Sequence, residues 1–264
     1  MSSPVPCDTA FYLYCLTPPG NTLELSHSGV LVEELGSARA VLSEVQREEF
    51  SGQEAEERLK DLAWLAPRAA RHEALVEQVM SQAPVLPAPF ATLFESRESV
   101  RRFLLEHAVR IAGYFRDLGN KREWAVKGFL DRAQLDVESR PEMEQSSAGK
   151  SYLEKKRAQA ALREVARRDL RIACQQAAAQ LKEQAQDFRE RKVWKAGQSA
   201  GQPELIFNWA FLLPAGEEPA FRESAARLDL QNRPLGLRMV ISGPWPPYSF
   251  TPALGLAAGN EDLR

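Results

Sequence analysis

Residues 64–94 read WLAPRAARHEALVEQVMSQAPVLPAPFATLF, and this stretch decides the fold. Apolar residues recur at helical spacing after Pro67, so we predict a helix with Pro67 in its first turn, where its missing N–H has no partner to lose. Pro84 ends that helix, because the residue before a proline is driven out of the α region. The next residues are apolar but too rich in proline for a central strand. They predict a short buried strand or an extended turn that leads into a second helix at Ser96 and fixes how two layers pack.

The residues around this stretch extend it into one α+β layer. Strands are predicted at residues 11–16, 23–25, 30–34 and 39–45. A turn at Gly36 and Ser37 joins the last two strands into a hairpin. Helical periodicity covers residues 53–82, with a break near 64–67, and residues 97–118. We therefore predict an N-terminal domain, residues 1–120, in which mixed strands carry helices on one face.

The second half of the chain has a different order of elements. Strands are predicted at 123–130, 192–195, 205–213 and 236–242, and helices at 152–188 and 217–229. This βαββαβ order predicts a ferredoxin-like domain over residues 121–242, followed by a tail rich in proline and aromatic residues over 243–264. A helix as long as 152–188 exceeds the diameter of a domain of about 100 residues, so part of it must extend past its own sheet, pack elsewhere or meet another molecule.

Composition excludes several classes of protein. The chain is 44% hydrophobic and 27% charged with a net charge of −2, which is typical of a globular protein and gives no basic footprint for nucleic acid. No stretch is long and apolar enough to span a membrane. An odd number of cysteines and an N-terminus without a signal-peptide pattern favour reduced thiols, so we expect a cytoplasmic protein.

Sequence motifs give no support for catalysis. Residues 197–201 match the G-x-S-x-G pattern of hydrolases, but no histidine follows His107, so the order of a catalytic triad is not met. Residues 149–151 resemble only the end of a phosphate-binding loop, and a helix start explains them better. The three histidines lack the spacing of a metal site. We expect no enzyme, no cofactor and no metal.

Three segments of the chain resemble one known family. They are WLAPRAARHEALV with APVLPAPFATLF in residues 64–94, KREWAVKGFLD at 121–131, and GPWPPYSF at 243–250. Together they resemble the gas vesicle protein F/L family (GvpF and GvpL), and the likeness runs from FYLYCL at residue 11 to the WPPYSF segment. One departure is Ala91, where the family pattern has a glycine before Thr-Leu-Phe, and it bears on the backbone geometry of that turn.

The resemblance implies a function in gas vesicle assembly. Such proteins would have two α+β domains, the second a variant of the ferredoxin fold. They would bind the hydrophobic shell protein (gas vesicle protein A) and other accessory proteins, limit aggregation of the shell protein and help to nucleate the shell, with or without remaining as minor vesicle components. This function needs exposed apolar surface. The candidate partner-binding residues are aromatic: Phe90, Phe207, Trp209, Phe211, Trp245, Tyr248 and Phe250.

Three alternatives stay open at this point. The prolines around Trp245 preset an extended backbone that either docks on the protein itself or contacts a partner. Basic residues in the first half of the long helix form either a solvated face or a docking surface for an acidic partner. Finally, a ferredoxin-like sheet also suits a module that binds a small molecule or effector.

Overall fold

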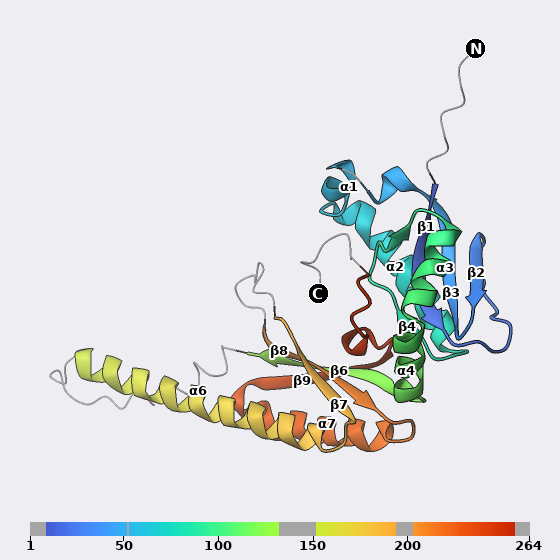
Figure 1. The fold of residues 1–264 in the computed structure, drawn as a ribbon. Helices are drawn as coiled ribbons and strands as arrows, with labels where there is room; N and C mark the ends of the chain where they lie inside the picture. The colour runs from blue at the N-terminus through green and yellow to red at the C-terminus, as the bar shows by residue number, and fades with distance from the viewer. Residues whose placement is uncertain (1–8, 52, 132–151, 194–202, 257–264) are drawn as a thin grey trace, which may run out of the picture. The chain divides into compact units, whose positions relative to one another are not determined.

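The computed structural model describes residues 9–51, 53–131, 152–193 and 203–256. The chain divides into two compact units. The first unit is Met1–Lys121 together with Trp245–Arg264, and the second is Arg122–Pro244. Each unit contains one β-sheet with its own helices, so the fold is mixed α+β as predicted (Figure 1).

The first unit is built on a sheet with the strand order β2-β3-β1-β4, in which β5 also pairs with β1. Its elements are β1 (Thr9–Thr17), β2 (Val30–Leu35), β3 (Ala38–Gln46), η1 (Arg47–Glu49), α1 (Gln53–Arg58), α2 (Leu62–Met80), β4 (Leu86–Pro87), β5 (Leu93–Phe94), α3 (Arg97–Glu106), α4 (Ala108–Leu118) and η3 (Tyr248–Phe250). The strands predicted at 11–16, 30–34 and 39–45 are confirmed. The strand predicted at 23–25 is wrong. The Gln82 side chain accepts from Glu24 N–H at 2.8 Å, and the Gln78 side chain donates to Glu24 O at 3.1 Å. The last turn of α2 and the residues just after it therefore hold this backbone in place of a neighbouring strand.

Helices cover both faces of this sheet. Leu13 points to the layer that contains Val100 of α3, whereas its neighbour Tyr12 points to the layer that contains Leu75 of α2. The pairing of β1 with β3 shifts between Leu13 and Cys15, which places Cys15 on the α2 side as well. The prediction of helices on one face is therefore wrong. Almost every residue of β1 is buried, which is the pattern of a strand covered on both sides.

The helices begin and end at residues that differ from the prediction in two places. Asp61 caps α2 by accepting a hydrogen bond from Ala63 N–H at 2.9 Å, so the helix starts at Leu62 and Pro67 lies inside it, not in its first turn. The single helix predicted over 97–118 is two helices, α3 and α4, which meet at His107. The helix start at Ser96 is confirmed.

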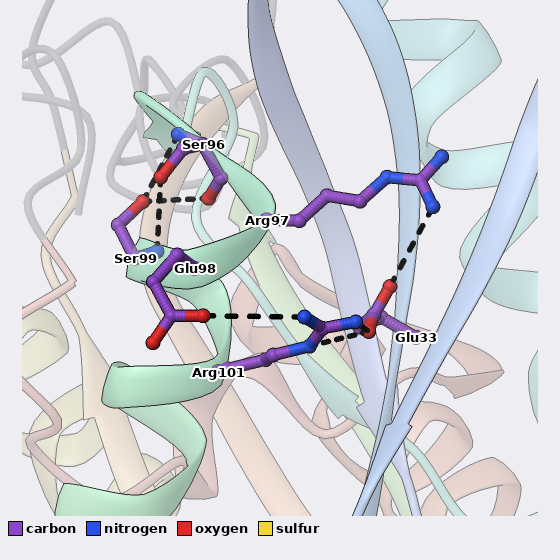
Figure 2. Close-up of polar contacts among 6 residues, drawn as sticks. All are labelled: Glu33, Ser96, Arg97, Glu98, Ser99 and Arg101. Carbon is purple, nitrogen blue, oxygen red and sulfur yellow. Dashed lines mark hydrogen bonds and ion pairs between the residues drawn. The ribbon is translucent and has the colours of Figure 1, made fainter.

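Figure 2 shows how α3 is fixed against β2. Ser96 and Ser99 form a reciprocal capping box at the start of the helix, each side chain accepting from the backbone N–H of the other at 3.1 Å. One turn on, Arg101 reaches Glu33 of β2 at 2.5 Å, and Arg97 lies 4.0 Å from the same carboxylate. The Glu33 side chain is only 13% exposed, so this ion pair is partly shielded from water and helps to position the helix.

The proline-rich crossover predicted after α2 is present as two short strands that both pair with β1. β4 lies beside Cys15 and Leu16, and β5 lies beside Phe11 and Tyr12. Between the strands the chain turns through Ala91, which has a φ of 62°. This is the left-handed region that costs an L-residue about 1–2 kcal/mol. Glycine, which the sequence analysis expected at this position, would adopt this φ without that cost.

We predict that Ala91→Gly stabilises the protein by up to about 1 kcal/mol, because the relief of strain exceeds the entropy that glycine adds to the unfolded chain. Ala88→Gly is the matched control. Ala88 is fully buried and has no positive φ, so its replacement is expected to cost about 1 kcal/mol. Urea unfolding of the two variants should give free-energy changes of opposite sign. Equal losses of stability would show that Ala91 is not strained.

The second unit has the element order βαββαβ and a sheet with the order β7-β8-β6-β9. Its elements are β6 (Arg122–Leu130), α6 (Tyr152–Lys182), β7 (Asp187–Arg191), β8 (Glu204–Leu213), α7 (Glu218–Asn232), η2 (Arg233–Leu235) and β9 (Leu237–Trp245). β8 is antiparallel to both β6 and β7. The core forms where α6 and α7 pack on the sheet, around Phe211, Phe221 and Leu181.

Two predicted boundaries in this unit are wrong. The long helix ends at Lys182, and Phe188 belongs to β7, where it pairs with Phe211. That pairing moves the strand predicted at 192–195 upstream to 187–191. The motifs at 149–151 and 197–201 lie outside the described residues.

The first half of α6 extends beyond the sheet of its own unit (Figure 1). Ala177 and Leu181 are buried against that sheet, but residues 156–165 are exposed throughout. At about 1.5 Å per residue this exposed part is about 15 Å long. Within the described ranges, no helix is both long and apolar enough to cross a membrane.

Candidate functional site

The three aromatic residues of β8 that were predicted to bind a partner lie in the core of the second unit. Phe207, Trp209 and Phe211 are 5%, 4% and 0% exposed. The rings of Phe207 and Trp209 stack with centroids 3.6 Å apart and planes 9° apart. All three contact the layer formed by α6 and α7. In this conformation a partner has no access to them, so they hold the unit together.

The aromatic residues of the tail pack on the first unit. Tyr248 O–H donates a hydrogen bond to Glu73 of α2 at 3.1 Å. A few residues later Leu254, only 4% exposed, is part of the core beneath α3 and α4. Phe250 is half-buried, and Trp245 is 36% exposed. The tail therefore docks on the protein itself and leaves Trp245 accessible.

Phe90, the remaining predicted residue, lies in a cluster of rings on the first unit. Its centroid is 6.3 Å from Phe50, 5.9 Å from His72 and 6.1 Å from Tyr12. Phe50 contacts Trp64 in turn at 5.6 Å. These residues come from β1, the loop after η1, α2 and the crossover, so four segments distant in sequence meet here. Phe50, Trp64 and Phe90 are half-buried and offer apolar surface to solvent.

A cavity of about 460 Å³ opens beside this cluster. Its lining combines aromatic rings, hydroxyl groups and two arginines: Tyr12, Tyr14, Ser28, Gly29, Ser43, Glu44, Val45, Glu49, Phe50, Pro67, Arg68, Arg71 and Phe90. The volume falls within the range of about 300–1,000 Å³ that is usual for pockets. We call this site the aromatic cavity.

The hydroxyl groups at the floor of the aromatic cavity are paired. Tyr12 accepts a hydrogen bond from Ala91 N–H at 3.0 Å, and its hydroxyl group shares a second hydrogen bond of 2.9 Å with His72 Nδ1. Tyr14 and Ser43 share a hydrogen bond of 3.0 Å. A neutral imidazole can accept this hydrogen bond at Nδ1. The hydroxyl groups of Tyr12, Tyr14 and Ser43 are thus each hydrogen-bonded under an apolar wall.

Burial sets the protonation of these groups. It lowers the pKa of His72 to about 4, and the backbone of Ala88 opposes only part of that shift. Burial also raises the pKa of Tyr12 and of the Cys15 thiol well above their usual ranges. Glu73 has a raised pKa for the same reason, despite its hydrogen bond from Tyr248. Near pH 7 His72 and Tyr12 are therefore neutral, which suits an apolar guest.

Charges lie only at the rim. The Arg68 guanidinium stacks over the Trp64 ring at 4.2 Å and lies 3.5 Å from a Glu49 carboxylate oxygen. Arg71 is exposed beside it. Among the described residues there is no group of three His, Cys, Asp or Glu side chains that could hold a metal ion. The arrangement is suited to binding an apolar side chain under a polar rim.

Sequence reasoning identified Phe90 but missed the rest of the aromatic cavity. One signal was available: Tyr12 and Tyr14 alternate in FYLYCL, so two aromatic rings with polar tips occupy one face of a strand. The contributions of Phe50 and Trp64 had no local signal, because they depend on how α2 packs on the sheet.

Comparisons with known proteins give a consistent result. The sequence pattern of the family described as gas vesicle synthesis protein GvpL/GvpF matches residues 10–252. The chain is 26% identical to gas vesicle protein L of Streptomyces sp. over 87% of this chain and 84% of that protein. It is 27% identical to gas vesicle protein L1 of Halobacterium salinarum over 92% of this chain and 91% of that protein.

Two crystal structures share the fold. The gas vesicle protein GvpF from Anabaena sp. PCC7120 superimposes with a TM-score of 0.68 at 21% identity, over 92% of this chain and 96% of that one. GvpF from Microcystis aeruginosa gives a TM-score of 0.61, also at 21% identity, over 91% of this chain and 98% of that one.

Proposed function

Because the chain belongs to the gas vesicle synthesis protein GvpL/GvpF family, we propose that it is a cytoplasmic, gas vesicle-associated accessory protein that binds the hydrophobic shell protein, gas vesicle protein A. It would limit aggregation of the shell protein and help to nucleate the shell, with no catalytic step. Membership of this family supports a role in gas vesicle assembly. Binding of the shell protein is our proposal, and the observation that supports it is the aromatic cavity on the first unit.

The aromatic cavity has the features of a binding hot spot. Its rings present a rigid apolar wall, its floor is neutral, and the Arg68–Glu49 pair lies at the rim. Hot spots are enriched in aromatic residues and arginine and are surrounded by contacts that exclude water. An apolar side chain of the shell protein inserted here would be removed from water. Exposure of such apolar surface to water otherwise drives the shell protein to aggregate.

Of the seven residues proposed from the sequence, the structure favours those on the first unit. Phe90 lines the cavity, and the Tyr248 ring lies 6.4 Å from the His72 ring behind it. Phe207, Trp209 and Phe211 would contribute to binding only through the stability of the second unit.

We also propose that the second unit is ferredoxin-like, because its βαββαβ order and its sheet order β7-β8-β6-β9 support that arrangement, and that the domain boundary lies near residue 121.

The proposal predicts that Phe50→Ala/Phe90→Ala lowers shell-protein binding at least tenfold, because each change removes part of the cavity wall. The measurement is the amount of shell protein kept in solution on co-expression, followed by pull-down. The matched control is Leu105→Ala/Val109→Ala, which removes apolar side chains that are 64% and 87% exposed on α3 and α4. Circular dichroism checks the fold of both variants.

Equal behaviour of the two double variants would refute the assignment of the aromatic cavity. Truncation before residue 243, a simpler experiment, does not isolate binding, because it also removes Tyr248 and Leu254 from the first unit. If the cavity instead binds a small molecule and wild-type protein leaves the shell protein insoluble, the alternative of an effector-binding module would replace the proposal.

A further inference from the structure

β2 is the edge strand of the sheet in the first unit. The strand order β2-β3-β1-β4 places it at one end, and none of the strands in the described part of the chain pairs with its outer side. In Figure 1 it is the outermost strand of this sheet. An edge strand presents a row of N–H and C=O groups to which another strand can bind.

The hairpin turn identifies which backbone groups point outward. Leu35 pairs with Ala38 across a turn of two residues, in which Gly36 has a φ of 60°. The pair that closes such a turn is hydrogen-bonded, and hydrogen-bonded pairs alternate with non-bonded ones along an antiparallel ladder. Residues 31, 33 and 35 therefore bond to β3. The N–H and C=O groups of Val30, Val32 and Glu34 point away from the sheet.

The edge is not protected in the usual ways. Proteins block edge strands with lysine, proline, a bulge or a charged side chain that points inward. β2 reads VLVEEL, pairs with β3 without a break, and has Val32 43% exposed. Glu33 points inward, but Arg97 and Arg101 neutralise it, as Figure 2 shows. The edge thus remains apolar, with one exposed carboxylate at Glu34.

The edge is continuous with the aromatic cavity. Ser28 and Gly29 line the cavity and lead directly into Val30, the first residue of β2. Val30 pairs with Ser43, which lies in the cavity lining. A partner segment with one side chain in the cavity would therefore lie directly beside the first residue of β2. At about 3.3 Å per residue, the edge then offers about 20 Å for pairing.

We propose that β2 binds an extended, apolar segment of the shell protein by β-strand addition, with an adjoining side chain of that segment held in the aromatic cavity. This inference rests on the proposed function and names the backbone contact by which it works. The segment would be apolar next to Val32 and would have no acidic residue next to Glu34. A second copy of this chain fits less well, because pairing along a six-residue edge alone would leave the adjoining aromatic cavity unused.

Strand addition gives a sharp test, because its contacts are to the backbone. Val32→Pro removes an outward N–H and leaves the ladder to β3 intact, as is tolerated on edge strands. We expect shell-protein binding to fall at least tenfold in the co-expression and pull-down assay. Val32→Ala removes the side chain but keeps the N–H, so its loss is expected to be about threefold or less. Val32→Lys keeps the N–H but places a charge on the edge, and is expected to match Val32→Pro.

The possible results separate this inference from the proposed function. If Val32→Pro and Val32→Lys bind normally while Phe50→Ala/Phe90→Ala does not, strand addition is overturned and the cavity stands. An equal loss in Val32→Ala and Val32→Pro would show a side-chain contact and also overturn it. No binding by the wild-type chain overturns both. Light scattering that shows a dimer abolished by Val32→Pro would assign the edge to a second copy instead.

Discussion

Gly128→Ala is expected to destabilise the second unit by about 3 kcal/mol, the largest effect of any single methyl group that we identify. A Cβ at this position would lie 2.2 Å from a ring carbon of Phe207, the residue opposite Gly128 across the β6–β8 ladder. Phe207 cannot easily move aside, because its ring stacks on Trp209 in the core. Denaturant unfolding followed by tryptophan fluorescence measures the loss, since Trp209 lies next to the site.

A double-mutant cycle tests this cause. Phe207→Leu removes most of the obstructing ring, so Gly128→Ala should cost much less in the Phe207→Leu background than in the wild type. The control is Gly113→Ala in α4, where the nearest atom to the new methyl group would be a flexible guanidinium nitrogen at 3.7 Å. There alanine should stabilise the helix by about 0.5–1 kcal/mol. Additive effects at residues 128 and 207 would show that the two positions are not in conflict.

The sequence was sufficient for elements with strong local signals. Helical periodicity, the Ser96 cap and the strand predicted at residues 39–45 each correspond to an observed element. The boundaries failed where tertiary pairing competed with a local pattern. Phe188 continues the apolar stripe of α6, but its pairing with Phe211 places it in β7. The helical spacing of apolar residues carries no information about strand pairing between segments that are distant in sequence.

The candidate site was less predictable, because an aromatic residue on a strand can either fill the core or line a cavity. LIFNWAFLL and FYLYCL are similar strands in sequence, and both alternate aromatic with other residues. In β8 the aromatic face is sealed by α6 and α7. In β1 the corresponding face leaves room at Tyr12 and Tyr14 for a cavity, because Pro67 and Arg68 lie above them on α2. Helix packing decides whether the aromatic face of a strand is covered, and the sequence of the strand alone does not predict it.

The protein should lose stability as the pH falls from 7 to 5, and His72 should account for about 2 kcal/mol of that loss. The folded state holds the pKa of His72 at about 4, whereas an unfolded chain has the ordinary value of 6.5. Between pH 6.5 and pH 4, His72 binds a proton in the unfolded chain but not in the folded protein, so a fall in pH favours unfolding. The full effect is present above pH 6.5 and disappears as the pH approaches 4. Urea unfolding at pH 7 and pH 5 measures it.

His72→Asn isolates this contribution, because Asn does not titrate and its side-chain amide can replace Nδ1 as the hydrogen-bond partner of the Tyr12 hydroxyl. The variant should be less stable at pH 7, since it fills less of the core. Its stability should nevertheless fall by about 2 kcal/mol less than that of the wild type between pH 7 and pH 5. Glu73, whose raised pKa acts in the opposite direction, is common to both proteins and cancels in the comparison. Identical pH profiles would mean that His72 takes up its proton without leaving the folded state, and that the floor of the aromatic cavity can hold a charge.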